Sequence, residues 1–201
     1  MTLYKPEVTA KPSGGFLGVQ ETGIVQFKDR SGEYDWADVF IEIEIAIPNS
    51  KYTNTLSLKG AIEKNDAGEV SGGSVLKRLY GVFEAIGCTA GINLKGEWES
   101  DDGQIIPNIA EYLNERFAEG GFPDKTDVPF NYVSFAYKIQ NKLTKKVYTE
   151  VYPKLCANTT KGKAELSSYI KWMQNKGFLN EYKENSTGNA TPTTQATLDN
   201  L

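Results

Sequence analysis

The sequence predicts a mainly β protein with inserted helices, an α+β class for which an OB-like antiparallel β-barrel is the leading candidate. Three segments with strand-like alternation precede the first helical pattern, and two further strand-like segments follow the second one. A parallel α/β sheet would need regular alternation of strands and helices. In an OB-like barrel, by contrast, a helix commonly interrupts the strand order.

The first three expected strands are residues 16–28, 36–47 and 54–63. The clearest alternation is that of 36–47, WADVFIEIEIAI, in which every second residue from Val39 onwards is aliphatic and Pro48 ends the strand. A turn-rich stretch follows the third strand, so these segments predict consecutive antiparallel strands.

Three helices are expected among the later strands. Ser74 is expected to cap a helix that Gly87 ends, and Asn108 to cap a second helix that extends to residue 121. A short strand is expected at 94–98, two longer strands at 130–140 and 146–156, and an amphipathic helix at 163–177. Residues 16–183 are thus expected to form one domain, between a flexible leader (1–15) and a disordered tail (184–201).

Composition excludes several functional classes. The chain of 201 residues has no histidine, so it lacks the commonest metal ligand and the commonest general base. Cys88 and Cys156 are expected to be buried free thiols, since two distant cysteines cannot complete a zinc site. The many Asp and Glu residues leave an oxygen-ligand Mg²⁺ site open. The carboxylate pairs Glu42/Glu44 and Asp101/Asp102 lack matching Asp and Lys residues at the spacing of a nuclease, so we expect no enzyme, no metal and no cofactor. With neither a membrane-spanning run nor a secretory signal in the sequence, the expected location is the cytoplasm.

Charge is distributed unevenly along the chain. The net charge is −4, but the stretch from Lys125 to Lys183 holds eleven lysines and four acids, while the rest of the chain has a net charge of −11. Segregation of this kind predicts a basic face for an anionic partner.

The last two expected strands, 130–140 and 146–156, read as a hairpin with a loop at 141–145. One face of this hairpin is expected to be apolar, and the other to alternate tyrosines with lysines. The proposed register gives three cross-strand pairs: Ile139 with Val147, Lys138 with Tyr148, and Tyr132 with Lys154.

Tyrosines alternating with lysines suit an unpaired polynucleotide. Aromatic rings stack on bases of any sequence, and lysines bind phosphates. Arginine, which reads base edges, occurs only three times in the chain. Tyrosine and lysine are also common on solvated edge strands that bind nothing. The candidate nucleic-acid-binding residues are Tyr132, Lys138, Lys142, Lys145, Lys146, Tyr148, Tyr152, Lys154, Lys161 and Lys163.

Tryptophans outside the hairpin are expected to be structural. Trp36 and Phe40 fall on the polar side of their strand beside acids, and we expect a helix to cover them. Trp172 lies off the apolar stripe of its helix and is expected to pack at the flank.

Three segments resemble phage-encoded single-stranded DNA-binding proteins with an OB fold: SVLKRLYGVFEAIGC, FNYVSFAYKIQN and KKVYTEVYPKLCANTTKGKAELSSYIKWM. The resemblance is architectural and covers roughly residues 16–180. It implies a non-sequence-specific protein that coats single strands during phage DNA replication or recombination in the host cytoplasm, alongside replication or recombination proteins. The usual strongly acidic tail is missing, because residues 184–201 contain only Glu184 and Asp199 as acids.

A second interpretation remains open, namely a virion or assembly protein that uses a tyrosine-rich β surface for protein contacts. The sequence also leaves open the oligomeric state and the choice between DNA and RNA.

Overall fold

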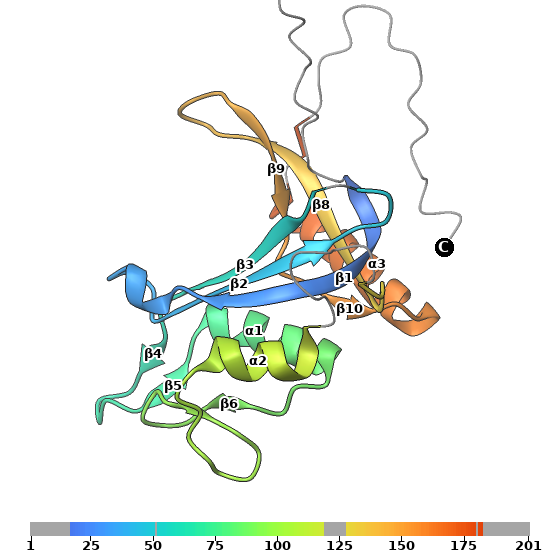
Figure 1. The fold of residues 1–201 in the computed structure, drawn as a ribbon. Coiled ribbons are helices and arrows are strands. Elements are labelled where there is room, and N and C mark those ends of the chain that lie inside the picture. The colour runs from blue at the N-terminus through green and yellow to red at the C-terminus, as the bar shows by residue number, and fades with distance from the viewer. Residues whose placement is uncertain (1–16, 51, 119–127, 180, 183–201) are drawn as a thin grey trace, which may run out of the picture.

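The computed structural model describes residues 17–50, 52–118, 128–179 and 181–182. The protein is of the predicted α+β class, with a mainly antiparallel sheet and, in these ranges, three α-helices (Figure 1). The main sheet consists of β1 (Gly18–Asp29), β2 (Val39–Ala46), β3 (Asn54–Gly60), β8 (Tyr132–Gln140), β9 (Val147–Val151) and β10 (Cys156–Ala157). Its order is β10-β8-β1-β2-β3, with β9 also paired to β8. The expected leader (1–15) and tail (184–201) lie outside the described residues.

Strand β1 belongs to both halves of the sheet. Its first residues, Gly18–Thr22, pair with β8, and its later residues, from Gly23 to Asp29, pair with β2. The segment that leads into β8 crosses β1 at this change of partner: a Cβ on Gly23 would lie 2.3 Å from Val128 Cγ1. Beside it, the buried hydroxyls of Thr22 and Ser134 are hydrogen-bonded at 2.7 Å, which joins β1 to β8.

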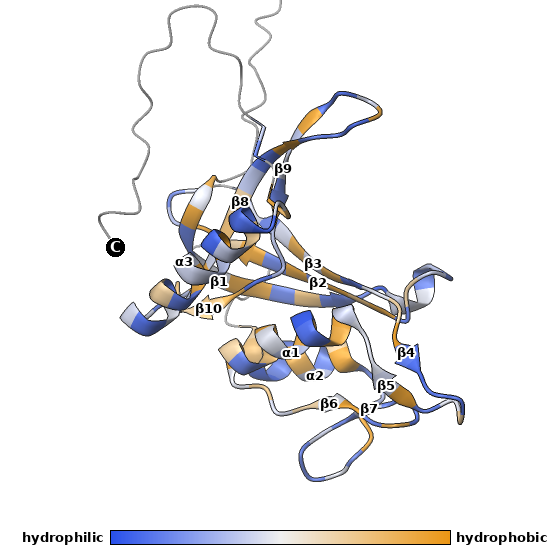
Figure 2. Ribbon diagram, turned by 180° about the vertical axis from the view of Figure 1, so that it is seen from behind, coloured by the Kyte–Doolittle hydropathy of each residue, from blue (hydrophilic) through white to orange (hydrophobic). Residues whose placement is uncertain are grey.

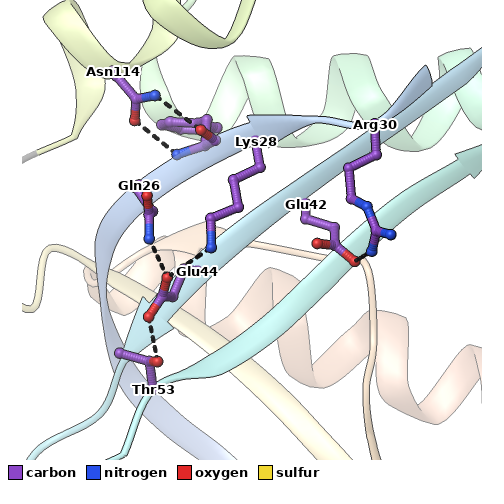
Figure 3. A network of polar contacts seen from close by, with 8 residues as sticks. Gln26, Lys28, Arg30, Glu42, Glu44, Thr53 and Asn114 are labelled. Atoms are coloured by element: carbon purple, nitrogen blue, oxygen red, sulfur yellow. Dashed lines mark hydrogen bonds and ion pairs between the residues drawn. The ribbon is translucent and has the colours of Figure 1, made fainter. Parts of the chain in front are cut away.

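The larger core lies between β1–β3 and two helices. Helices α1 (Ser74–Ile86) and α2 (Ile109–Phe117) lie on the same side of these strands (Figure 1). The alternation predicted for 36–47 is confirmed, since Ile41, Ile43 and Ile45 are fully buried. The side chain of Asn114 on α2 accepts a hydrogen bond from the Phe27 amide at 2.8 Å and donates one to the Phe27 carbonyl at 2.9 Å (Figure 3). These bonds satisfy backbone groups of β1 that do not pair with β2.

A smaller core lies between β8, β10 and helix α3 (Thr160–Asn175) (Figure 2). It contains seven buried residues: Val133, Phe135, Cys156, Leu166, Ile170, Met173 and Leu179. The helix begins three residues before the predicted start at 163, because Thr159 is the N-cap and its Oγ1 accepts a hydrogen bond from the Gly162 amide.

Some local predictions were wrong. Gly73, with φ 133°, and not Ser74, precedes α1, and no side chain caps that helix. The expected strand at 94–98 is mostly a turn between the short strands β6 (Gly91–Ile92) and β7 (Trp98–Glu99). Residues 146–156 are two strands, because the chain leaves the ladder from Tyr152 to Leu155, around Pro153.

The remaining elements lie beyond the main sheet. They are the two-stranded ribbon of β4 (Glu63–Lys64) and β5 (Val70–Gly72), and the 3₁₀ turn Ser31–Glu33 between β1 and β2. No helix in the described part of the chain is both long and apolar enough to cross a bilayer.

Candidate nucleic-acid interface

The β8–β9 hairpin projects from the sheet as an arm (Figure 1). Its register differs by one residue from the predicted one: Ile139 pairs with Tyr148 and not with Val147. The turn is longer than expected because Asn141 Oδ1 accepts hydrogen bonds from the amides of Leu143 and Thr144, each at 2.9 Å, and Lys145 adopts a left-handed φ of 58°.

A register shift of one residue places every β9 side chain opposite a β8 residue of the other face from the one predicted. Lys138 therefore lies opposite Thr149, and the predicted pair of Lys138 with Tyr148 is wrong. Tyr148 shares its face with Glu150, which lies opposite Tyr137. Rings and lysines thus do not alternate on one face of the two strands.

Two of the three predicted tyrosines pack against the cores, Tyr132 as a buried residue and Tyr152 as a half-buried one. Tyr152 stacks on Phe135, with ring centroids 5.0 Å apart, and burial raises its pKa to about 12. Tyr132 is buried in the larger core and lies opposite Ala157, so its predicted pairing with Lys154 is wrong. Only Tyr148, of which 48% is exposed, offers a ring to a ligand.

Four of the predicted lysines do lie together. Lys138, Lys142, Lys145 and Lys146 are exposed along the outer half of the arm, and none of them forms an ion pair within the described residues. We call these four lysines the arm lysines. The arm is correspondingly hydrophilic over most of its length (Figure 2). It offers mobile positive charge on a turn whose backbone is already ordered.

The other three predicted lysines lie around the start of α3. Lys154 bridges Glu165 at 2.7 Å, and Lys163 bridges Glu21 at 3.6 Å. The hydrogen bond from Lys154 lowers the pKa of the Glu165 carboxyl. Lys161 is exposed, but it lines a hollow that Glu84 and Glu165 also line. Carboxylates therefore offset much of the charge here, and this group does not extend the arm.

An aromatic cluster at the β1–β2 connection was missed by sequence reasoning. No helix covers Trp36, of which 54% is exposed, and it contacts Tyr34 and Phe40 with ring centroids 5.5 and 6.1 Å away. The guanidinium of Arg30 lies 5.3 Å, and the ammonium of Lys59 5.4 Å, from the Phe40 ring centroid. We call Tyr34, Trp36 and Phe40 the loop rings. Their signal was present in the sequence, as aromatic residues on the polar side of an alternating strand.

Two acids on the outer face of β2 are paired with cations of β1 and the residue that follows it. Glu42 bridges Arg30 at 3.1 Å, and Glu44 bridges Lys28 at 3.5 Å while accepting hydrogen bonds from Gln26 and Thr53 (Figure 3). These partners offset the charge of Glu42 and Glu44, whereas Asp35 and Asp38 beside Trp36 form no ion pair within the described residues.

Strand β3 lies between the loop rings on the β2 side and the arm strand β9. Cα atoms of β3 and β9 approach within 8 Å, although no ladder joins these strands among the described residues. Burial raises the pKa of the Glu150 carboxyl on β9, and the positive charge of Lys59 on β3 opposes that rise, so the two side chains are within electrostatic reach. The outer face therefore continues from Tyr148 on β9 to Lys59, which contacts the Phe40 ring.

Truncating the two hairpin tyrosines separately tests this arrangement. Tyr152→Ala should lower the free energy of unfolding by about 3 kcal/mol, because it removes a ring packed on Phe135. Tyr148→Ala should change it by no more than about 0.5 kcal/mol, because that ring is half exposed. Urea denaturation measures both, and equal losses would contradict the assigned faces.

The described residues contain no group of three or more Cys, Asp or Glu side chains arranged to hold a metal ion. No family model, curated protein or solved structure matches the chain. The functional argument therefore depends on the geometry of the surface.

Proposed function

We propose that this protein binds single-stranded DNA without sequence preference, across the outer face between the arm and the loop rings. The main support is that Tyr148 and three arm lysines of the turn, Lys142, Lys145 and Lys146, stand at one end of this face, and these lysines form no ion pair within the described residues. The loop rings lie at the other end, where Tyr34 and Trp36 are exposed and Phe40 is buried beneath them. Lysines on a mobile stem suit phosphates, and aromatic rings suit unstacked bases.

The proposal includes an OB-like barrel. Three strands in succession, a helical insertion and a returning hairpin that pairs with the first strand are consistent with that architecture. In this interpretation the barrel closes where β3 approaches β9, and side chains complete the seam. The β1–β2 and β8–β9 connections then flank one binding face.

The lack of sequence preference follows from which groups are available. Arg30 is engaged by Glu33 and Glu42, and hydrogen bonding to Glu33 raises the pKa of its guanidinium further. It therefore has little capacity left to read a base edge as a fork. Stacking and phosphate contacts remain, and both tolerate any base.

Such a protein would coat and protect unpaired strands during replication or recombination. The resemblance to phage proteins favours a phage role in the host cytoplasm, with replication or recombination proteins as partners. RNA offers the same stacking bases and phosphates, so an unpaired RNA strand is expected to bind the same face.

Titrating the full chain into fluorescently labelled oligo-dT at several salt concentrations tests the proposal. We expect binding at low salt that weakens with a negative log–log slope of about 0.7 per phosphate contact. A duplex of the same length should bind more weakly, because its bases are not free to stack. Absence of binding to oligo-dT at low salt would overturn the proposal and favour a virion or assembly protein.

A further inference from the structure

A second set of exposed rings lies at the C-terminal end of α3, outside the face described above. We call Tyr169, Trp172 and Phe178 the helix rings. Trp172 is 48% exposed and Phe178 is 61% exposed. The Trp172 ring stacks on Tyr169, with centroids 5.8 Å apart, and lies 5.6 Å from Phe178. Trp172 was expected to pack at the flank of its helix, and half of it is nevertheless left in solvent.

The fold holds these rings in place. Tyr169 packs edge-on against the buried Phe135, at 6.1 Å between centroids. Beyond the helix, Gly177 adopts φ 70° and the Phe178 amide donates to Met173 O at 2.9 Å, which turns Phe178 back towards Trp172. Buried Leu179 fixes the chain immediately afterwards. Two large apolar rings are thus ordered at the surface, which suits an incoming flat ligand.

The surroundings of the helix rings are positive. Lys171 and Lys176 are exposed, and neither forms an ion pair within the ranges that the structure describes. The sequence from Leu166 to Leu179 contains no acid. Apolar rings flanked by unpaired lysines complement a ligand that has both flat faces and negative charge.

The helix rings are connected to the base of the arm. The amide of Tyr182 donates to the carbonyl of Lys138 at 2.7 Å, so the segment that follows Phe178 reaches β8 where the arm lysines begin. Glu181 is the acid on this route, and its charge adds to the effect of burial in raising the pKa of Tyr137. A DNA strand bound along the arm can therefore follow this segment from β8 to Phe178 and Trp172.

We propose that the helix rings are a second stacking subsite, which takes the bases of a longer single strand after it has passed the arm. This inference depends on the proposed function. The surface that bound DNA covers then extends beyond the outer face of β2 and β3. Trp172 and Phe178 would each stack on a base, and Lys171 and Lys176 would contact phosphates. A short oligonucleotide would occupy only the outer face between the arm and the loop rings.

The test uses the full chain with Trp172→Ala and Phe178→Ala combined, and oligo-dT of about 8 and about 30 nucleotides, which bracket the site of one OB fold. We expect affinity for the long strand to fall at least about tenfold, because each stacked base contributes a factor of that order. Affinity for the short strand should stay within about twofold. Leu94→Ala, which removes a similarly exposed apolar side chain from the β6–β7 turn, should affect neither strand.

A second measurement protects against loss of folding in the double variant. The tryptophan fluorescence of the wild-type chain should be quenched more strongly by the long oligonucleotide than by the short one, and Trp172→Phe alone should abolish this difference while Trp36 and Trp98 are left in place. Unchanged long-strand affinity in the double variant, together with equal quenching of the wild-type chain by the two oligonucleotides, would overturn the subsite while leaving the proposed function intact. A change from dimer to monomer in the double variant, with long-strand affinity retained, would overturn it in favour of a contact between copies. Failure of the wild-type chain to bind either strand would overturn both proposals.

Discussion

Replacing Lys142, Lys145 and Lys146 together by alanine should lower the affinity for oligo-dT by about a hundredfold at low salt and reduce the log–log salt slope by about 2. These ammonium groups are exposed, and they form no ion pair in the part of the chain that the structure describes. Their charge is thus fully available to phosphates. Anisotropy titrations at several salt concentrations measure both quantities.

The triple substitution should leave the fold intact. Asn141 holds the turn through its side-chain oxygen, and none of the three lysine side chains contributes to that bonding. Lys145 already adopts a left-handed backbone conformation, so alanine introduces no new strain there. The melting temperature should accordingly change by no more than about 2 °C, as for other exposed side chains.

A matched control is Lys64→Ala, Lys77→Ala and Lys95→Ala, which removes the same charge from exposed positions on β4, α1 and the β6–β7 turn. This variant should keep nearly all of its affinity. Equal losses in the two triple variants would mean that only net charge matters, and would contradict a binding site on the arm.

The second large effect concerns stability. Gly162→Ala should lower the free energy of unfolding by about 3 kcal/mol, because a Cβ at this position would lie 2.0 Å from the backbone oxygen of Ala157. Neither partner can move freely, since Ala157 belongs to β10 and Gly162 to the first turn of α3. Relief would require α3 to shift away from the smaller core.

Gly81→Ala is the control for Gly162→Ala. Gly81 lies within α1 and a Cβ there would meet nothing within 4 Å, so alanine should raise the free energy of unfolding by about 0.5–1 kcal/mol through helix propensity. Urea denaturation of both variants measures the two changes in the free energy of unfolding, which should have opposite signs. If Gly162→Ala were neutral or stabilising as well, the close packing of α3 on β10 would be incorrect.

The strands and helices were predictable where periodicity is strong. Alternation from Val39 to Ile45 identified β2, and the Asn108 cap and the stop at Gly87 were both correct. The hairpin register was not predictable from alternation alone, because it depends on a turn set by the Asn141 side chain and the left-handed Lys145. That single-residue difference placed Tyr148 opposite Ile139 and not opposite Lys138.

The candidate site was predictable only in part, for a similar reason. The arm lysines lie close together because they are close in the sequence. The loop rings lie near the arm only through the approach of β3 to β9, a non-local contact that no local pattern encodes. Phe40 was expected to be covered by a helix; it is indeed buried, but beneath Tyr34, Trp36, Arg30 and Lys59.

The double membership of β1 has a consequence for how the protein loses its structure. Separating β1 from its neighbours would break the ladder to β2 and the ladder to β8 together, and would expose the Thr22–Ser134 hydrogen bond to water. Loss of β1 would therefore disrupt both cores at once, so this strand links the unfolding of the larger core to that of the smaller one.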